Sequence, residues 1–466
     1  MSEIKAAMEQ VKQLHDKDFS LPETQREIFS LFESLFGIII AQQQEIQELK
    51  DEINRLKGEQ GKPKFTTKKP DTKTGKERKI ETDPKKPWVK SSKKGKIRID
   101  RTEIIRLDPN KLPTDAEFKG YEDKIVQNIE IKTDNVLYKL EKYYSPSERK
   151  TYIAETEEEL IGTEYGAETK ALISSLYYEN RVTENKIASF LNSNGLYISE
   201  GTVSNILIKE QSAELTKVKK EIFEAGLSSS TYQQIDDTGM KVAGENAYAT
   251  IVCNEKYTAF FINLSKSRET IKTFLTAYLL SLFIVLVGDD APQFKKLAAR
   301  FALCWVHEER HYKKMNPVLD AHRAELSRVR GEIWQYYEKL KTYKQNPTDE
   351  KKGELWDEFD VIFGQQTPYG DLQNRLALTF AKKSELLTVL DYPEIPLHNN
   401  LSENGVREMV LKRKISGGVE TEDGLKAWEN NMSILAACKK LGVSFYEFMK
   451  GIFSKNITID LPELIR

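Results

Sequence analysis

The stretch of sequence that most constrains the fold lies between Thr231 and Asp290. Three β-rich runs, TYQQIDDT, AYATIVCNEK and YTAFFINLSK, follow one another with tight connections. RETIKTFLTAYL then has helical spacing, and LFIVLVGDD is a continuous apolar run. The first three runs predict an antiparallel meander, and the last predicts a central strand buried on both faces. The resulting β-β-β-α-β order favours an α/β sheet.

Two aspartates are expected at the ends of neighbouring strands in this sheet. Asp236 lies on the first β-rich run, and Asp289 directly follows the apolar run. Open α/β sheets bind ligands at the carboxyl ends of their strands near the switch in strand order, so the two carboxylates would meet there if their strands are neighbours. Two Mg²⁺ ions roughly 4 Å apart, held by such carboxylates, can activate an attacking oxygen and stabilise a leaving one. Asp237 and Asp290 compete for these roles, because adjacent strand residues point to opposite faces.

A third carboxylate is expected from the segment LHNNLSENGVREMVLKRKISGG. Asn399 and Asn400 resemble a helix cap, and a helix that follows them would carry Glu403, Arg407 and Lys414 on roughly one face. Glu403 could then bind metal while the cations meet phosphates. The alternative is a Glu-Arg pair on a solvated helix, which stabilises it by only about a few tenths of a kcal/mol.

The segment ALCWVHEERHYKK contains Cys304, His307 and His311, a spacing that invites a zinc interpretation. No second cysteine lies near in the sequence, and a structural zinc site usually has four ligands. We therefore favour a packed cysteine and a histidine placed near the carboxylates. Residues 312–395 carry amphipathic helical stretches, which predict an all-helical insertion between the sheet and the Glu403 helix.

The first 98 residues predict a dimerisation helix followed by a tether. Within residues 1–60, apolar side chains keep a seven-residue repeat over residues 28–56, which favours a parallel two-stranded coiled coil. A single helix packed on its own domain is the alternative. Residues 61–98 are rich in Lys, Arg and Pro with almost no aliphatic side chains, and so predict a disordered basic linker that can also grip phosphates.

Between this linker and the predicted sheet, the sequence indicates a hairpin and then helices. The alternating runs KIVQNIEIK and VLYKLEKYY predict a β-hairpin within residues 99–145. Residues 146–228 are predicted to be helical, and helices of about residues 183–191 and 200–209 around a Gly-bearing turn have the layout of a helix-turn-helix. The alternative is an ordinary structural helix pair. If the second helix enters a major groove of DNA, the contacts are assigned to Ser199, Thr202, Ser204 and Lys209.

Composition bounds the class of protein. A chain of 466 residues and 53.7 kDa with 39% hydrophobic residues can bury several cores. The predicted sheet and the segments after it are divided into residues 229–311, the insertion at 312–395, and residues 396–466. A net charge of -1 neither favours nor excludes nucleic acid as a partner. Three cysteines indicate a reducing compartment, and the lack of a signal-peptide pattern or a membrane-length apolar run predicts a cytoplasmic protein without a membrane partner.

Several of these residues stand in the order of a known set of motifs. They are Asp236-Asp237-Thr238 for an Asp-Glu-Thr triplet, Asp289 in VGDDAPQF, Cys304, His307 and Arg310 for Cys-x-x-His-x-x-Arg, and Asn399, Asn400, Glu403, Arg413 and Lys414 for Asn-Asn-x-x-Glu followed by Arg-Lys. In this order, over residues 231–418, the chain resembles the DDE transposases of the insertion-sequence-66 family. Members often carry a cysteine-rich zinc unit before the core, whereas this chain has no cysteine before Cys253. We expect the hairpin to replace that unit and predict no zinc.

The resemblance implies a ribonuclease-H-like α/β core that binds two Mg²⁺ or Mn²⁺ ions, cuts DNA at the ends of a mobile element and joins the 3′-hydroxyls to target DNA. Asp236, Asp289 and Glu403 would be the catalytic metal ligands. Supporting roles are assigned to Cys304, His307, Arg310, Asn399 and Asn400, and further DNA contacts to Arg407, Arg413 and Lys414. The implied partners are DNA, a second copy through residues 28–56 and element-encoded accessory proteins. The alternatives are a catalytically silent DNA-binding protein and a nuclease that only hydrolyses.

Overall fold

The computed structural model describes residues 35, 37, 39, 42, 97–108, 113, 115–155, 164–279 and 285–466. The chain divides into one compact unit of residues 1–44 and 131–466 and a second of residues 45–130. The predicted coiled coil over residues 28–56 lies outside the described residues, except at four isolated helical positions. The predicted linker also lies outside them, apart from its last two residues. In the described part of the second unit, no residue belongs to a helix or a strand.

The predicted sheet is present as five strands in the order β5-β4-β3-β6-β7. Its members are β3 (Tyr232–Val242), β4 (Glu245–Cys253), β5 (Thr258–Asn263), β6 (Val285–Gly288) and β7 (Arg300–Leu303). The first three form the predicted antiparallel meander, and β6 runs parallel to both β3 and β7. Ala243 and Gly244 join β3 to β4 with positive φ at both positions, as a two-residue hairpin turn requires. This mixed α/β sheet is compatible with a ribonuclease-H-like core.

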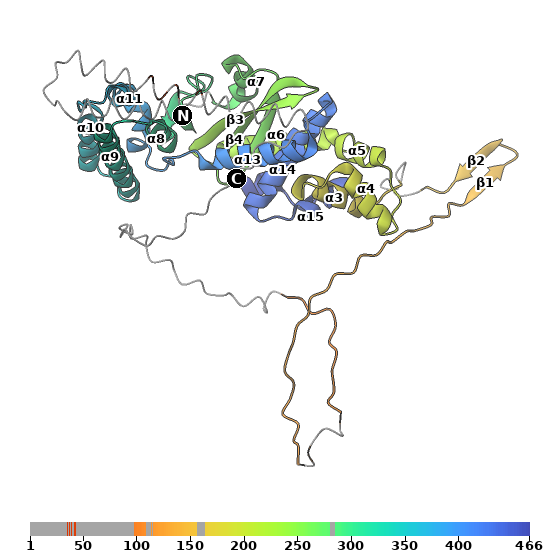
Figure 1. Cartoon of the computed structure of the whole chain (residues 1–466). Helices are drawn as coiled ribbons and strands as arrows, with labels where there is room; N and C mark the ends of the chain where they lie inside the picture. The colour runs from red at the N-terminus through yellow and green to blue at the C-terminus, as the bar shows by residue number, and fades with distance from the viewer. Residues whose placement is uncertain are drawn as a thin grey trace. The chain divides into compact units, whose positions relative to one another are not determined.

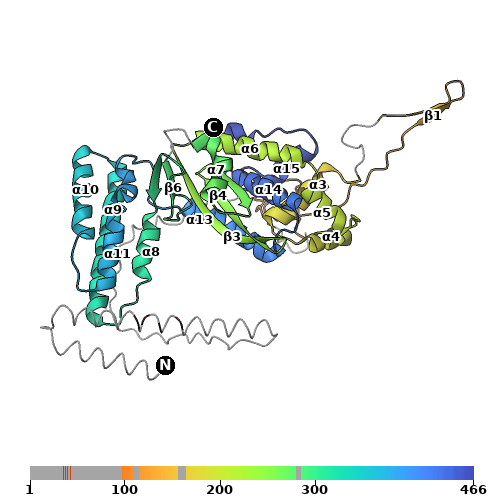
Figure 2. The same cartoon turned by 90° about the horizontal axis from the view of Figure 1, so that it is seen from above.

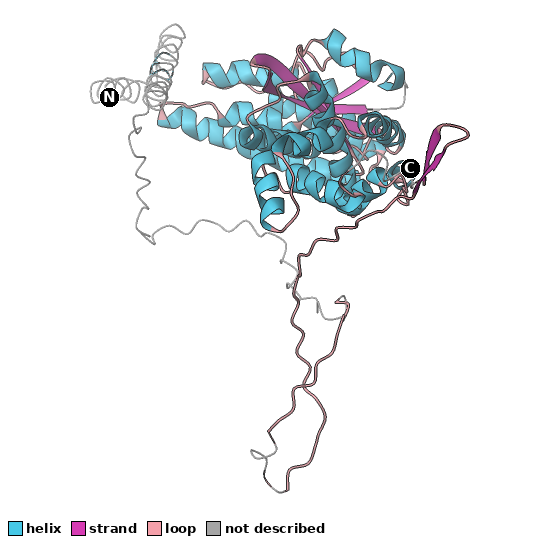
Figure 3. Ribbon diagram, turned by 90° about the vertical axis from the view of Figure 1, so that its right-hand side faces the viewer, coloured by secondary structure: helices cyan, strands magenta, loops and turns pink. Residues whose placement is uncertain are grey.

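Helices lie on both sides of this sheet (Figures 1 and 3). The segment between β5 and β6 includes α7 (Arg268–Leu279), whose Phe274 stacks on Phe261 of β5. On the other face, α13 (Asn400–Ser416) packs on β3 and β4. A Cβ at Gly405 of α13 would lie 2.9 Å from Ile251 Cγ2, so glycine allows this helix to approach the sheet closely.

The predicted all-helical insertion forms its own core against the β6–β7 edge. It comprises α9 (Asp320–Gln345), α10 (Asp349–Phe363), α11 (Gly370–Phe380), α12 (Lys383–Leu386) and η5 (Thr388–Leu390), and follows α8 (Trp305–Lys313). Trp305, Tyr336 and Phe359 are buried together with Val285 and Val287 of β6. Figure 2 shows α8 to α11 gathered beside β6.

The remaining helices form the opposite end of the unit (Figure 2). They are α3 (Ala167–Ser174), η4 (Ser175–Glu179), α4 (Glu184–Ser193), α5 (Glu200–Ile208), α6 (Ser212–Ser228), α14 (Glu422–Leu441), α15 (Phe445–Phe453) and α16 (Leu461–Ile465). The helix pair expected at residues 183–191 and 200–209 is therefore present as α4 and α5, within two residues at each end. Its use in DNA binding stays a prediction.

The predicted hairpin within residues 99–145 is wrong in its position. The observed strands are β1 (Lys142–Ser145) and β2 (Lys150–Ile153), and residues 124–132 belong to no strand. The strands pair Tyr143 with Tyr152 across a turn that contains Pro146 and a positive φ at Arg149. The predicted helical region is therefore wrong at residues 146–153, because the Ser-Pro pair of this turn favours chain reversal.

Candidate active site

Asp236 lies on β3 in a partly buried cluster of acids. Its carboxylate accepts a hydrogen bond of 2.8 Å from the backbone N–H of Asp237. Burial, together with the nearby carboxylates of Asp289, Asp237 and Glu403, raises the pKa of Asp236 to about 7 against the effect of that hydrogen bond. A cation placed among these acids would relieve both the burial penalty and the mutual repulsion.

Asp289 reaches the same edge of the sheet, as the sequence predicts. It follows β6, which pairs in parallel with β3 so that Val287 stands beside Gln234. Asp289 accepts a hydrogen bond of 3.2 Å from the backbone of Ala291. Burial raises the pKa of Asp289, and so do its acidic neighbours, while this hydrogen bond and the His307 ring act in the opposite direction.

The two competing aspartates have partners of their own. The Asp237 carboxylate accepts a hydrogen bond of 2.6 Å from Gln293 Nε2. Asp290 forms ion pairs with Lys295 at 2.7 Å and with Lys382 at 2.6 Å. Burial alone would raise the pKa of Asp290, but these two lysines outweigh it and the pKa is lowered. These partners are consistent with Asp236 and Asp289 as metal ligands, an assignment that stays a prediction.

Glu403 lies one turn into α13 and is held by cations. Its carboxylate accepts hydrogen bonds of 3.0 and 3.3 Å from Arg310 Nη2, and its Oε1 lies 3.4 Å from His307 Nε2. Arg407, one turn further along the helix, is 3.6 Å away. Arg310 also lies 2.9 Å from His307 Nε2. Burial lowers the pKa of His307, and the Arg310 charge lowers it further, which favours the neutral ring.

In this structure Glu403 pairs with cations, and the three acids do not form a closed metal site. In the part of the chain that the structure describes, no three His, Cys, Asp or Glu side chains converge closely enough to hold a metal ion. Asp236 and Asp289 have carboxylate oxygens of the kind that Mg²⁺ and Mn²⁺ prefer, and their mutual repulsion fits a cation between them.

Cys304 and His307 are placed by the end of β7. The Cys304 backbone donates a hydrogen bond of 2.9 Å to Gly288, the last residue of β6, and Trp305 donates one of 3.0 Å to Leu397. The Cys304 side chain is buried, and burial raises the pKa of its thiol. The helix α8 therefore starts at the sheet edge and presents His307 and Arg310 to Glu403.

Gln234 is a site residue that the sequence reading missed. The predicted cap is only partly right, because Asn399 occupies the N-cap position of α13 but its side chain makes no capping hydrogen bond. Instead, Gln234 Oε1 accepts hydrogen bonds of 3.0 Å from Leu401 N and 3.3 Å from Ser402 N, and Gln234 Nε2 donates to His398 O at 3.2 Å. A buried polar residue two positions before Asp236, on the same strand face, was the available signal.

The predicted DNA contacts fall into two groups on different helices. On α13, Arg407 and Lys414 are exposed, and Arg413 Nη1 donates to Thr238 Oγ1 at 3.4 Å. The other group belongs to α5, which packs against α3, α4 and α14. There Ser199 caps the helix by accepting from Thr202 N, Thr202 and Ser204 are half-buried, and Lys209 is exposed.

A cavity of about 450 Å³ opens beside Asp289. Its wall is formed by Asp289, Cys304, His307, Arg310, His311 and Lys314 among others. The cavity thus places cationic side chains of α8 next to an acid of the cluster.

Among the described residues, no helix is both long enough and apolar enough to span a bilayer.

Comparison with known proteins adds two findings. A family model described as "Transposase IS66 family" matches residues 162–427, which is more than half of the chain. A protein of Sinorhizobium fredii named "Uncharacterized protein y4jO" is 41% identical over 165 residues, which are 35% of this chain and 51% of that protein. The chain thus spans about half the length of this curated relative.

Proposed function

Because the chain belongs to the IS66 family of transposases, we propose that it is a DNA transposase that cuts the ends of an insertion sequence and joins their 3′-hydroxyls to target DNA. The observation that carries this proposal is the acid cluster at the edge of the sheet. Burial and three neighbouring carboxylates raise the pKa of Asp236 to about 7, so the free site disfavours its own negative charge. Divalent cations and a phosphodiester would complete such a site.

We assign Asp236, Asp289 and Glu403 to hold two Mg²⁺ or Mn²⁺ ions. Bound there, the ions would activate the attacking oxygen and stabilise the leaving oxygen. With Glu403 assigned to an ion, Arg310, which pairs with its carboxylate in the free site, would be available to contact a DNA phosphate. His307, neutral in the free site, remains next to Arg310 and Glu403 and orients both.

Conservative substitutions test this assignment. Asp236→Asn, Asp289→Asn and Glu403→Gln remove one charged ligand each with little change in volume. We expect each to abolish cleavage and strand transfer on DNA that carries the sequences flanking the gene, while binding to the same DNA in a gel-shift assay is retained. Glu408→Gln, on the same helix as Glu403, is the matched control. If any of the three variants retains joining activity, the assignment of that residue as a metal ligand is refuted.

One observation favours a second candidate, a DNA-binding protein without chemistry. The pairing of Glu403 with Arg310 satisfies the third acid in the absence of metal. A protein of this class would bind the flanking DNA but never nick it in Mg²⁺ or Mn²⁺. A nuclease that only hydrolyses would give cut products and never joined ones, so one gel separates the three functions.

A further inference from the structure

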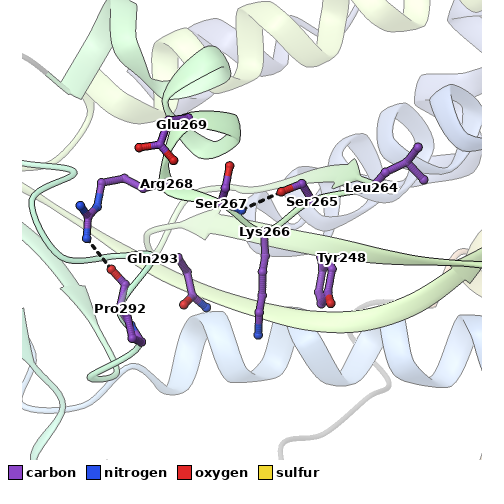
Figure 4. A pocket seen from close by; sticks show the side chains of 9 residues that line it. All are labelled: Tyr248, Leu264, Ser265, Lys266, Ser267, Arg268, Glu269, Pro292 and Gln293. Atoms are coloured by element: carbon purple, nitrogen blue, oxygen red, sulfur yellow. Dashed lines mark hydrogen bonds between the residues drawn. The ribbon is translucent and has the colours of Figure 1, made fainter.

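A groove of about 570 Å³ lies between β4, the start of α7 and the loop after β6. Its lining includes Tyr248 of β4, Lys266 from the turn after β5, and Gln293 from the loop after β6. Figure 4 shows these three side chains in a row, pointing to the same side, whereas Glu269 points to the other. The groove therefore presents an aromatic ring, a cation and an amide to a single occupant.

Tyr248 is half-buried on β4, and the residue opposite it on β3 has no side chain. Tyr248 stands opposite Gly239 in the antiparallel ladder. Gly239 has no side chain, and a Cβ built there would meet no atom within 4 Å. Cross-strand neighbours normally cover each other, so this glycine opens space beside the tyrosine. A flat group the size of a nucleobase fits against such a ring.

The charge at the groove suits a phosphate. Lys266 is exposed and its Nζ lies 5.2 Å from the centroid of the Tyr248 ring. The N-terminus of α7 opens beside it, where Ser267 Oγ accepts a hydrogen bond of 3.2 Å from Thr270 N. Arg268 donates a hydrogen bond of 2.7 Å to Pro292 O, which fixes the loop after β6 to this helix. A cation beside an aromatic ring is the combination that single-stranded nucleic acid requires.

The groove is connected to the acid cluster through two hydrogen bonds. Gln293 lines the groove and donates to Asp237 Oδ2 at 2.6 Å, and the backbone of Asp237 donates to Asp236 at 2.8 Å. Pro292 and Gln293 follow Asp289 by only three and four residues in the chain. The loop after β6 thus begins at Asp289 and continues to the groove, so a DNA strand bound at Asp289 would follow this loop around the end of β6 to reach the groove.

We propose that this groove binds an unpaired nucleotide of the DNA strand next to the scissile phosphate. The base stacks on Tyr248, and its phosphate contacts Lys266 and the N-terminus of α7. The nucleotide must be unpaired, because a base inside a duplex has no free face to stack on tyrosine. This proposal rests on the proposed function, since it assigns the path of the substrate at the same site.

Photo-crosslinking of the full chain tests the groove without any need for catalysis. The probe is a single-stranded oligonucleotide that contains 5-iodouracil, mixed with protein in EDTA and irradiated. We expect a crosslink in the tryptic peptide Val242–Lys256, which contains Tyr248, and none from the same oligonucleotide in a duplex. The crosslink yield against oligonucleotide concentration gives an affinity for this groove alone.

Two variants and a control sharpen the result. Lys266→Met should weaken the affinity read from this crosslink about tenfold, because it removes a phosphate contact. Gly239→Leu should abolish the crosslink, because its side chain fills the space beside Tyr248, which is open in the structure. Lys220→Glu, on an exposed position of α6, should leave the crosslink unchanged. Circular dichroism confirms that each variant is folded.

Crosslinks only at other peptides, or an equal yield from the Gly239→Leu variant, would overturn the proposal. The two proposals fail separately. If the chain cleaves DNA but gives no crosslink at Tyr248, the proposed nucleotide groove is refuted and the proposed transposase function stands. If the chain gives the crosslink but never cleaves DNA in Mg²⁺ or Mn²⁺, the nucleotide groove stands and the proposed reaction is refuted.

Discussion

Substitution of Gln234 by methionine isolates the link between the catalytic strand and the Glu403 helix. Methionine keeps the length and approximate volume of the side chain but removes both its donor and its acceptor. Three backbone groups then lose their partners, namely the N–H groups of Leu401 and Ser402 and the carbonyl of His398. Each lost hydrogen bond costs about 1 kcal/mol net, so the start of α13 should be destabilised by about 3 kcal/mol.

Hydrogen exchange measured by mass spectrometry is the appropriate assay, because it reports local opening. A loss of about 3 kcal/mol corresponds to an increase of roughly 150-fold in the exchange rate of the protected amides of residues 398–404. Gln233→Met is the matched control. Gln233 is a buried glutamine one position earlier on β3, but its amide donates to Gly226 on the opposite face of the sheet.

The activity of the Gln234→Met variant should fall with the exchange protection. Glu403 follows the affected amides by one and two residues. If the first turn of α13 opens more often, the Glu403 carboxylate is therefore held less precisely. We expect strand transfer to decrease strongly while gel-shift binding stays within about twofold, since a shift of about 1 Å in a catalytic group is enough to cost about 100-fold in rate. Unchanged exchange at residues 398–404, or an equal effect from Gln233→Met, would refute the positioning role of Gln234.

Three further predictions concern buried groups around the site. Burial lowers the pKa of Lys412 to about 7, below its value in the unfolded chain, so the unfolded chain binds this proton more tightly and the fold becomes less stable as the pH falls toward 7. In urea titrations, the free energy of unfolding of the wild type relative to Lys412→Met should therefore rise by about 1 kcal/mol between pH 7 and pH 8. Gly405→Ala should lower the urea midpoint and strand transfer together, because its Cβ would overlap Ile251 and push α13 from the sheet. Lys382→Met should destabilise the fold by about 3 kcal/mol in the same titration, because it removes a cation from the buried carboxylate of Glu308 as well as from Asp290; a change below about 0.5 kcal/mol would show that these ion pairs contribute little.

The sheet was predictable from the sequence because its signals are local. Alternation in the β3 to β5 runs and the continuous apolar run of β6 each follow from burial on one face or on two. The position of Asp289 next to Asp236 then follows from strand order alone. The misplaced hairpin shows the limit of this reasoning, because alternation in residues 124–132 occurs without a partner strand, whereas the short strand of Tyr143 forms beside a turn.

Contacts between segments that are distant in the chain could not be predicted from local sequence patterns. The cap of α13 comes from Gln234, more than 160 positions earlier in the chain, and the Asn399 that resembled a cap makes no such bond. The pairing of Glu403 with Arg310 also depends on how α8 and α13 approach, which no local spacing encodes. Only the adjacency of Glu403 and Arg407 on one helix face was visible in advance.

The two neighbouring aspartates of β3 can be understood from the alternation of this strand. Gln234 and Asp236 face α13, where the first holds the start of the helix and the second lies near the acid that the helix carries. Gln233 and Asp237 face the opposite side, where they bind α6 and the loop after β6 through Gln293. Because successive side chains of a strand alternate between faces, one short stretch can fix the helix on one side and the substrate groove on the other.

Asp237→Asn should therefore disturb the groove more than the acid cluster, and Asp236→Asn should disturb the acid cluster more than the groove. The crosslink at Tyr248 and the cleavage assay measure these two effects independently, and equal losses of both in each variant would contradict this division.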